Sequence, residues 1–164
     1  MNSDIEKKAK YLISKSRSSI PIDLNKIVTF LKIKVILKDF EDSISGVLLK
    51  KDKQIGDVIA INRNHPLTRK RFSIAHEIGH FVLSTGNKNH LDMVFRKENL
   101  ENKLDKDEIS ANQFAAALLM PRSELVKEIT SKRIKTMADV EKLSNKFNVS
   151  REAMTFRLMN LGIL

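Results

Sequence analysis

The chain has 164 residues, a length suited to one compact domain, and its 41% hydrophobic and 30% charged residues are typical of a globular protein. It contains no cysteine, which excludes disulfides and thiolate metal sites and suits a reducing compartment. Because there is no bilayer-length apolar run and no apolar secretory signal, we expect a cytoplasmic protein without a membrane partner. The net charge of +10 would suit nucleic acid, but dispersed lysines favour solvated helix faces.

The predicted elements run in the order helices, small sheet, helices, which is typical of an α+β fold. Apolar periodicity and turn signals predict helices over residues 4–18 and 23–31 and strands over residues 33–37, 46–50 and 57–62. Further helices are predicted over residues 67–84, 105–120, 122–131, 137–147 and 151–161, whereas residues 87–104 show no clear pattern.

Turn residues over 51–56 predict a hairpin between the second and third strands, and we expect the three strands to form a meander. The sheet should therefore be small, three-stranded and mostly antiparallel. We interpret residues 1–121 as the main domain and residues 122–164 as a helical extension, or tail, of the same compact unit.

The segment His76-Glu77-Ile78-Gly79-His80 has the H-E-x-x-H spacing. Residues four apart project from one face of a helix, so both imidazoles can bind one tetrahedral ion. The motif places a general base, here Glu77, within reach of a water on that ion. The alternative is a chance pair of helical histidines. The helix is apolar on nearly every side and should be buried, where two unpartnered histidines and a glutamate would be costly.

The following predicted helix offers a third ligand. Glu108 and Asn112 lie one turn apart on one face, and Asn112 could accept the ring N–H of a ligand histidine and fix its tautomer. Ala111, Ala115 and Gly79 would let the two helices approach closely. The alternative for Glu108 is a solvated carboxylate near a helix N-terminus, where the helix dipole favours negative charge.

Together these segments, Arg71-Phe-Ser-Ile-Ala-His-Glu-Ile-Gly-His80 and Glu108-Ile-Ser-Ala-Asn-Gln-Phe-Ala-Ala-Ala-Leu-Leu-Met-Pro121, resemble the ImmA/IrrE family of metallopeptidases. The resemblance covers most of the chain. It implies a zincin-like pair of active-site helices and one Zn²⁺ per chain, held by His76, His80 and Glu108. It also implies that Glu77 is the catalytic base.

The same resemblance implies a zinc metalloendopeptidase whose substrate is a protein. Family members typically cut helix-turn-helix repressors of phages or mobile elements, or a repressor of the DNA-damage response. We therefore expect a helix-turn-helix repressor as the partner of this chain.

Two further roles can be predicted only in outline. Peptidases commonly bind substrate as an added strand at a sheet edge. The strand Ile59-Ala60-Ile61-Asn62 directly precedes the metal helix, so we expect it to be that edge; the alternative is an interior strand. For the oxyanion, His90, Tyr11 and Arg69 are candidates by chemistry alone, and His90 lies in the loop between the two metal helices.

Residues 140–161 have the rhythm of a helix-turn-helix. With the basic net charge, this makes a DNA-binding or repressor-sequestering regulator without proteolysis the alternative function. We favour a helical hairpin that packs on the rest of the chain. The segment 151–161 is rich in Met, Phe and Leu and offers only Arg151 and Arg157 for contact with DNA.

Overall fold

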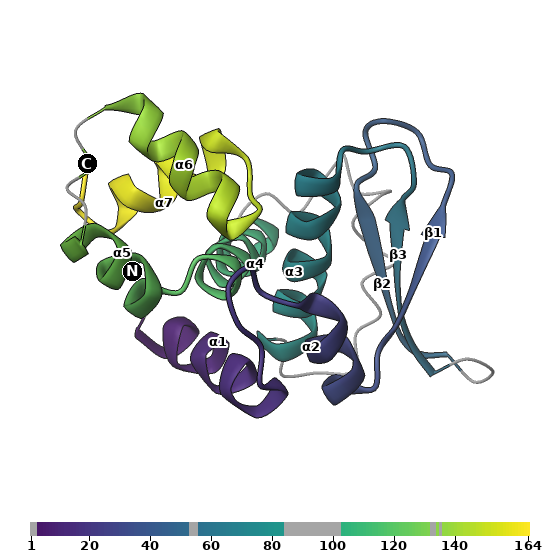
Figure 1. Cartoon of the computed structure of the whole chain (residues 1–164). Coiled ribbons are helices and arrows are strands. Elements are labelled where there is room, and N and C mark those ends of the chain that lie inside the picture. The colour runs from purple at the N-terminus through teal and green to yellow at the C-terminus, as the bar shows by residue number, and fades with distance from the viewer. Residues whose placement is uncertain (1–2, 53–55, 84–102, 132–133, 135) are drawn as a thin grey trace.

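The computed structural model describes residues 3–52, 56–83, 103–131, 134 and 136–164, which form an α+β fold (Figure 1). The elements within these residues are α1 (Ser3–Ser16), α2 (Leu24–Leu31), β1 (Lys34–Lys38), β2 (Gly46–Asp52), β3 (Gly56–Asn62), α3 (Leu67–Leu83), α4 (Lys103–Leu119), α5 (Arg122–Ser131), α6 (Met137–Phe147) and α7 (Arg151–Asn160). Each predicted helix and strand is confirmed, with ends that differ by a few residues at most.

The sheet is mixed, with strand order β1-β3-β2. β3 pairs antiparallel with β2, which confirms the predicted hairpin, but it pairs parallel with β1, from Lys34↔Val58 to Lys38↔Asn62. The expected meander is therefore wrong. The connection over residues 39–45 leads from the end of β1, past the end of β3, to the start of β2, and this route puts β3 in the middle.

The central position of β3 also corrects the expectation that Ile59, Ala60, Ile61 and Asn62 form a substrate-binding edge. All four residues are buried, and both sides of the strand are occupied by other strands. A strand that is apolar over consecutive residues, without alternation, is typical of a strand covered on both faces. Among the described strands the edges of the sheet are β1 and β2.

α3 lies between the sheet and the bundle formed by α1, α4, α5, α6 and α7 (Figure 1). The core includes the fully buried side chains of Ile59 from β3, Ile78 from α3, Phe114 from α4 and Leu158 from α7. α3 and α4 approach closely at Gly79, where a Cβ atom would lie 3.1 Å from both the Cα and the carbonyl oxygen of Ala111. This close approach confirms the expectation from the small residues.

The C-terminal helices pack onto the rest of the fold. A capping box between Thr136 and Asp139 starts α6, and the Ser150 hydroxyl caps α7. Arg157 on α7 is only 1% exposed; its guanidinium donates to the Met120 carbonyl at 3.0 Å and to Glu6 on α1 at 2.8 Å. One of the two arginines considered for DNA contact is thus turned into the protein interior.

No helix among the described residues is long and apolar enough to cross a bilayer.

Candidate metal centre

α3 presents two histidines and a glutamate at the centre of the fold. His76 and His80 are one helical turn apart, and their ring centroids are 4.5 Å apart. His80 and Glu77 are buried, and His76 is partly buried. The sheet covers one side of α3 and α4 the other, so these polar groups lie deep in an otherwise apolar layer.

α4 places the third group opposite the histidines. One carboxylate oxygen of Glu108 lies 3.3 Å from His76 Nε2, and the other lies 2.9 Å from His80 Nε2. One turn further on, Asn112 Oδ1 lies 2.9 Å from His76 Nδ1. An amide oxygen only accepts, so His76 donates from Nδ1 and keeps the lone pair of Nε2 directed toward Glu108.

His76, His80 and Glu108 offer one ligand atom each within 4.8 Å of one another, so the three residues are able to hold a metal ion. The two Nε2 atoms are only 2.9 Å apart, and at most one proton can lie between them. Glu108 Oε1 is buried without a hydrogen-bond partner, although His80 Nε2 is 2.9 Å away. The lone pairs of these nitrogen and oxygen atoms point toward one another, and there are too few protons to fill the space between them. A cation would satisfy such an arrangement, and two imidazoles with one carboxylate are a ligand set that fits zinc.

The electrostatics of the site separate the roles of its two carboxylates. Burial raises the pKa of Glu108, but the close approach of the His76 and His80 imidazoles outweighs it and lowers this pKa to about 2. Burial raises the pKa of Glu77, and the nearby histidines oppose that shift only in part. Glu108 is therefore held as an anion suited to a ligand, whereas Glu77 is a stronger base than an exposed carboxylate.

The site opens into a cleft of about 950 Å³. His76, Glu77, His80, Glu108 and Asn112 line one side. The opposite wall is the connection over residues 39–45 and the first residues of β2, Gly46 and Val47.

Three side chains hold the wall of residues 39–45 in place. Asn62 is fully buried and its Nδ2 donates to the carbonyls of residues 40, 41 and 44 at 3.2, 3.1 and 2.9 Å. His65 Nε2 lies 3.2 Å from the Asp42 carbonyl, and Arg69 donates to the Ser45 hydroxyl at 3.0 Å. Asn62 and His65 thus hold the connection that forms this wall of the cleft.

The three candidates for stabilising the oxyanion have different positions relative to the cleft. Tyr11 lies on α1 with its side chain 56% exposed and does not line the cleft. Arg69 lines it. His90 lies outside the described residues.

Gly46 was not anticipated: a Cβ there would lie 3.5 Å from Glu77 Cγ, so the strand start abuts the buried carboxylate. A lone glycine before an apolar strand was the only sequence signal for it.

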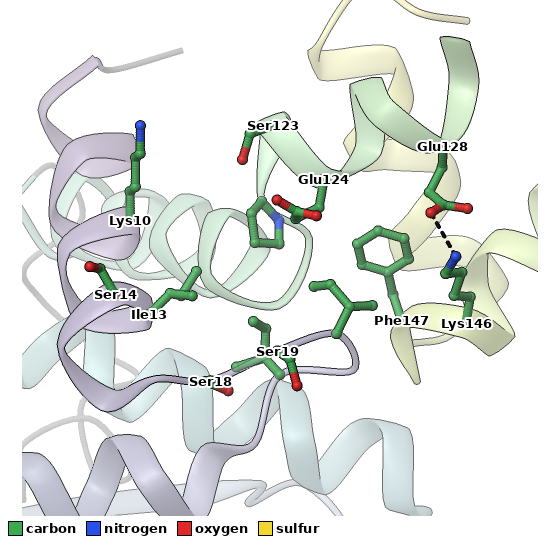
Figure 2. A pocket seen from close by; sticks show the side chains of 13 residues that line it. Lys10, Ile13, Ser14, Ser18, Ser19, Ser123, Glu124, Glu128, Lys146 and Phe147 are labelled. Carbon is green, nitrogen blue, oxygen red and sulfur yellow. Dashed lines mark hydrogen bonds and ion pairs between the residues drawn. The ribbon is translucent and has the colours of Figure 1, made fainter. Parts of the chain in front are cut away.

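A second hollow, of about 530 Å³, lies among α1, α5, α6 and the 17–23 connection, and Figure 2 shows it from close by. Its lining mixes serines and charged side chains with apolar ones, and Lys146 pairs with Glu128 at 2.6 Å. It shares no lining residue with the metal cleft, and the described residues place no histidine in it. Among the described residues, this hollow therefore offers no alternative metal site.

Comparison with known proteins shows the family and agrees with the fold. Residues 30–159 match the peptidase M78 family, described as the IrrE N-terminal-like domain, and the chain belongs to this family. The resemblance drawn from the sequence motifs is thereby confirmed. The match runs across residue 121, and the division there into a domain and an extension stays a prediction.

The chain is also similar to one phage protein in sequence and to one solved structure in fold. It is 34% identical over 110 residues to an "uncharacterized immunity region protein 2" of Bacillus phage phi105, a match that covers 67% of this chain and 64% of the relative. A solved structure described as a "Mycobacterium tuberculosis transcriptional regulator" superposes with a TM-score of 0.64 at 18% identity. That match covers 96% of this chain and 47% of the other, and it shows a shared fold.

Proposed function

We propose that this chain is a zinc-dependent endopeptidase that hydrolyses a peptide bond in a protein substrate. The observation that carries the proposal is the convergence of His76, His80 and Glu108 beside the buried Glu77 in an open cleft. Membership of a peptidase family supports it. The substrate that we propose is a helix-turn-helix repressor of a phage or mobile element, and the immunity-region name of the phage relative supports that context.

The side chains divide the chemistry between them. His76, His80 and Glu108 would hold one zinc ion, which when bound supplies Lewis acidity toward the scissile carbonyl and the attacking water. Glu77 accepts a proton from that water at its carboxylate and then delivers it to the leaving nitrogen. Its burial and raised pKa suit both steps, because such a carboxylate binds a proton more readily than an exposed one.

The substrate backbone is proposed to add to the outer edge of β2. β2 is an end strand, and its first residues, Gly46 and Val47, line the cleft beside Glu77. An extended peptide on this edge would gain main-chain hydrogen bonds and run past the metal ligands. This assignment replaces β3, which has no free edge.

The decisive experiment measures the metal content of the full chain and its action on a helix-turn-helix repressor, sought first among the genes beside its own. We expect about one zinc per chain and a single cut in the repressor, read by mass spectrometry. Glu77→Gln should keep the zinc and lose cleavage by at least about a hundredfold, since general acid–base catalysis is worth about that much or more. Glu141→Gln, an exposed carboxylate on α6, is the matched control and should cleave normally.

The alternatives give different results in the same experiment. Binding of the repressor without a cut would indicate sequestration. If the purified chain holds no zinc and the Glu77→Gln variant keeps full biological activity, the enzyme proposal is wrong. A DNA-binding regulator would instead shift a labelled duplex with steep salt dependence. The buried Arg157 and the exposed Phe156 and Met159 on α7 make that surface poorly suited to phosphates.

A further inference from the structure

Another groove, of about 680 Å³ and separate from the hollow in Figure 2, runs between the first half of α3, one face of α4, and α7. Its lining is largely apolar and comes from three separate parts of the chain; the apolar side chains include Phe72, Ile109, Ala116, Met120, Ala153 and Phe156.

This groove continues from the metal cleft. The groove and the metal cleft share the lining residues Arg69, Phe72 and Asn112. Asn112 contacts His76 directly through its amide oxygen, at 2.9 Å from Nδ1. A chain that lies in the cleft beside the metal ligands can therefore place a neighbouring side chain into the groove without leaving the surface.

Large apolar side chains border the groove and remain exposed. Ile109 on α4 is 52% exposed and Phe156 on α7 is 57% exposed. Two of the polar side chains in the lining are already engaged: Arg157 bonds Met120 and Glu6, and the Ser150 hydroxyl accepts from the Ala153 amide. Because most of the surface that lines the groove is apolar, it favours an aliphatic or aromatic side chain as the ligand.

We propose that this groove is a specificity pocket that binds a large apolar side chain of the protein substrate, on one side of the scissile bond. The inference rests on the proposed peptidase function and deepens it. Phe72, Ile109 and Phe156 act as specificity-determining residues; the C-terminal helix α7 thereby contributes to substrate choice while the metal ligands come from α3 and α4.

The test uses the zinc-loaded full chain and a mixed-sequence peptide library, with cut sites read by mass spectrometry. The wild-type chain should prefer Leu, Ile, Met or Phe at one fixed position beside the cut. Phe156→Ser and Ile109→Ser should each lower that preference by about tenfold, the usual scale for apolar pocket contacts. Zinc content and melting temperature should not change.

Matched variants separate the groove from the general surface. Met159→Ser alters the same helix at a side chain that is 55% exposed but lies outside the groove lining, and it should keep the wild-type preference. Phe156→Leu keeps an apolar contact and should restore most of the preference that Phe156→Ser loses.

The outcomes are distinguishable. If the zinc-loaded wild-type chain cuts neither the library nor the helix-turn-helix repressor, the proposed function is wrong, and this inference with it. Cleavage with equal preference in wild-type and Phe156→Ser chains removes the inference alone. If Phe156→Ser converts a dimer to a monomer in sedimentation and leaves the cut-site preference intact, the groove is an interface between copies and the pocket proposal is wrong.

Discussion

At the scale of single residues, the site depends on which nitrogen of His76 carries its proton. Asn112 Oδ1 accepts from Nδ1 at 2.9 Å, so Nε2 is left to face His80 and Glu108. Residues in this position behind a ligand histidine fix its tautomer and its ring orientation, and they raise its basicity.

Replacing Asn112 therefore tests the site without removing a ligand. Asn112→Ala should weaken zinc binding by about 10–100-fold, because His76 loses the partner that orients its ring. Competition with a chelator of known affinity measures the change. Asn112→Asp keeps the acceptor and should stay within a few-fold of wild type, as should Gln113→Ala at the next position. Unchanged zinc affinity in Asn112→Ala would show that the contact does not orient the ligand.

Much of the site was predictable from residue types and spacing. A pair of histidines one helical turn apart, followed by a second small-residue helix with Glu108 and Asn112, predicts that these side chains can converge, and they do. The wall opposite them was not predictable in this way. Asn62, His65 and Arg69 act through carbonyls and a hydroxyl of the 39–45 connection, and such contacts depend on how that connection crosses the sheet.

At the scale of elements, α3 and α4 need a glycine where they cross. In Gly79→Ala the added Cβ would lie 3.1 Å from the backbone of Ala111 and 3.3 Å from Phe114 Cβ. Neither neighbour is the flexible end of a side chain, so α4 must shift and Glu108 must shift with it.

We expect Gly79→Ala to lower both the melting temperature and the zinc affinity. Alanine gains about 1 kcal/mol of helix propensity over glycine, and the expected net loss means that the crowding exceeds this gain. Thermal unfolding with and without zinc measures both effects, and Gly79→Ser should be worse. A melting temperature above that of wild type would show that the helices are not in close contact there.

The strand order shows why local pattern did not give the whole sheet. The turn between β2 and β3 is local, and the hairpin was predicted correctly. The pairing of β1 with β3 joins strands that are not consecutive in sequence, and the residue pattern within β1 carries no information about its partner. The signal that was available lay in Val58–Ile61, whose unbroken apolar run indicates a central strand.

At the scale of the whole molecule, the metal would join two helices that are separate in sequence. A ligand that binds only the folded state stabilises it by about 4 kcal/mol at a thousandfold excess over its dissociation constant. For a chain of this size that corresponds to a shift of roughly 10 °C in melting temperature.

Chelation by EDTA should therefore lower the melting temperature of the wild-type chain by about that amount, and added zinc should restore it. His80→Ala removes a ligand, and its melting temperature should not respond to EDTA. Glu77→Gln should respond as wild type does, because Glu77 is not one of the three ligands. Equal melting temperatures for the wild-type chain with zinc and with EDTA would mean that these three ligands do not bind the ion.

The contact between Arg157 and Glu6 joins residues 151 positions apart. A ribosome releases the chain from the N-terminus, so Glu6 and the Met120 carbonyl emerge well before the arginine that satisfies them. Phe156, which lines the proposed specificity pocket, lies in the same turn of α7 and is synthesised just before Arg157. The metal ligands are thus synthesised before the surface that would select a substrate. That surface can form only after α7 has been synthesised, which delays selective cleavage beyond the point at which the metal ligands are present.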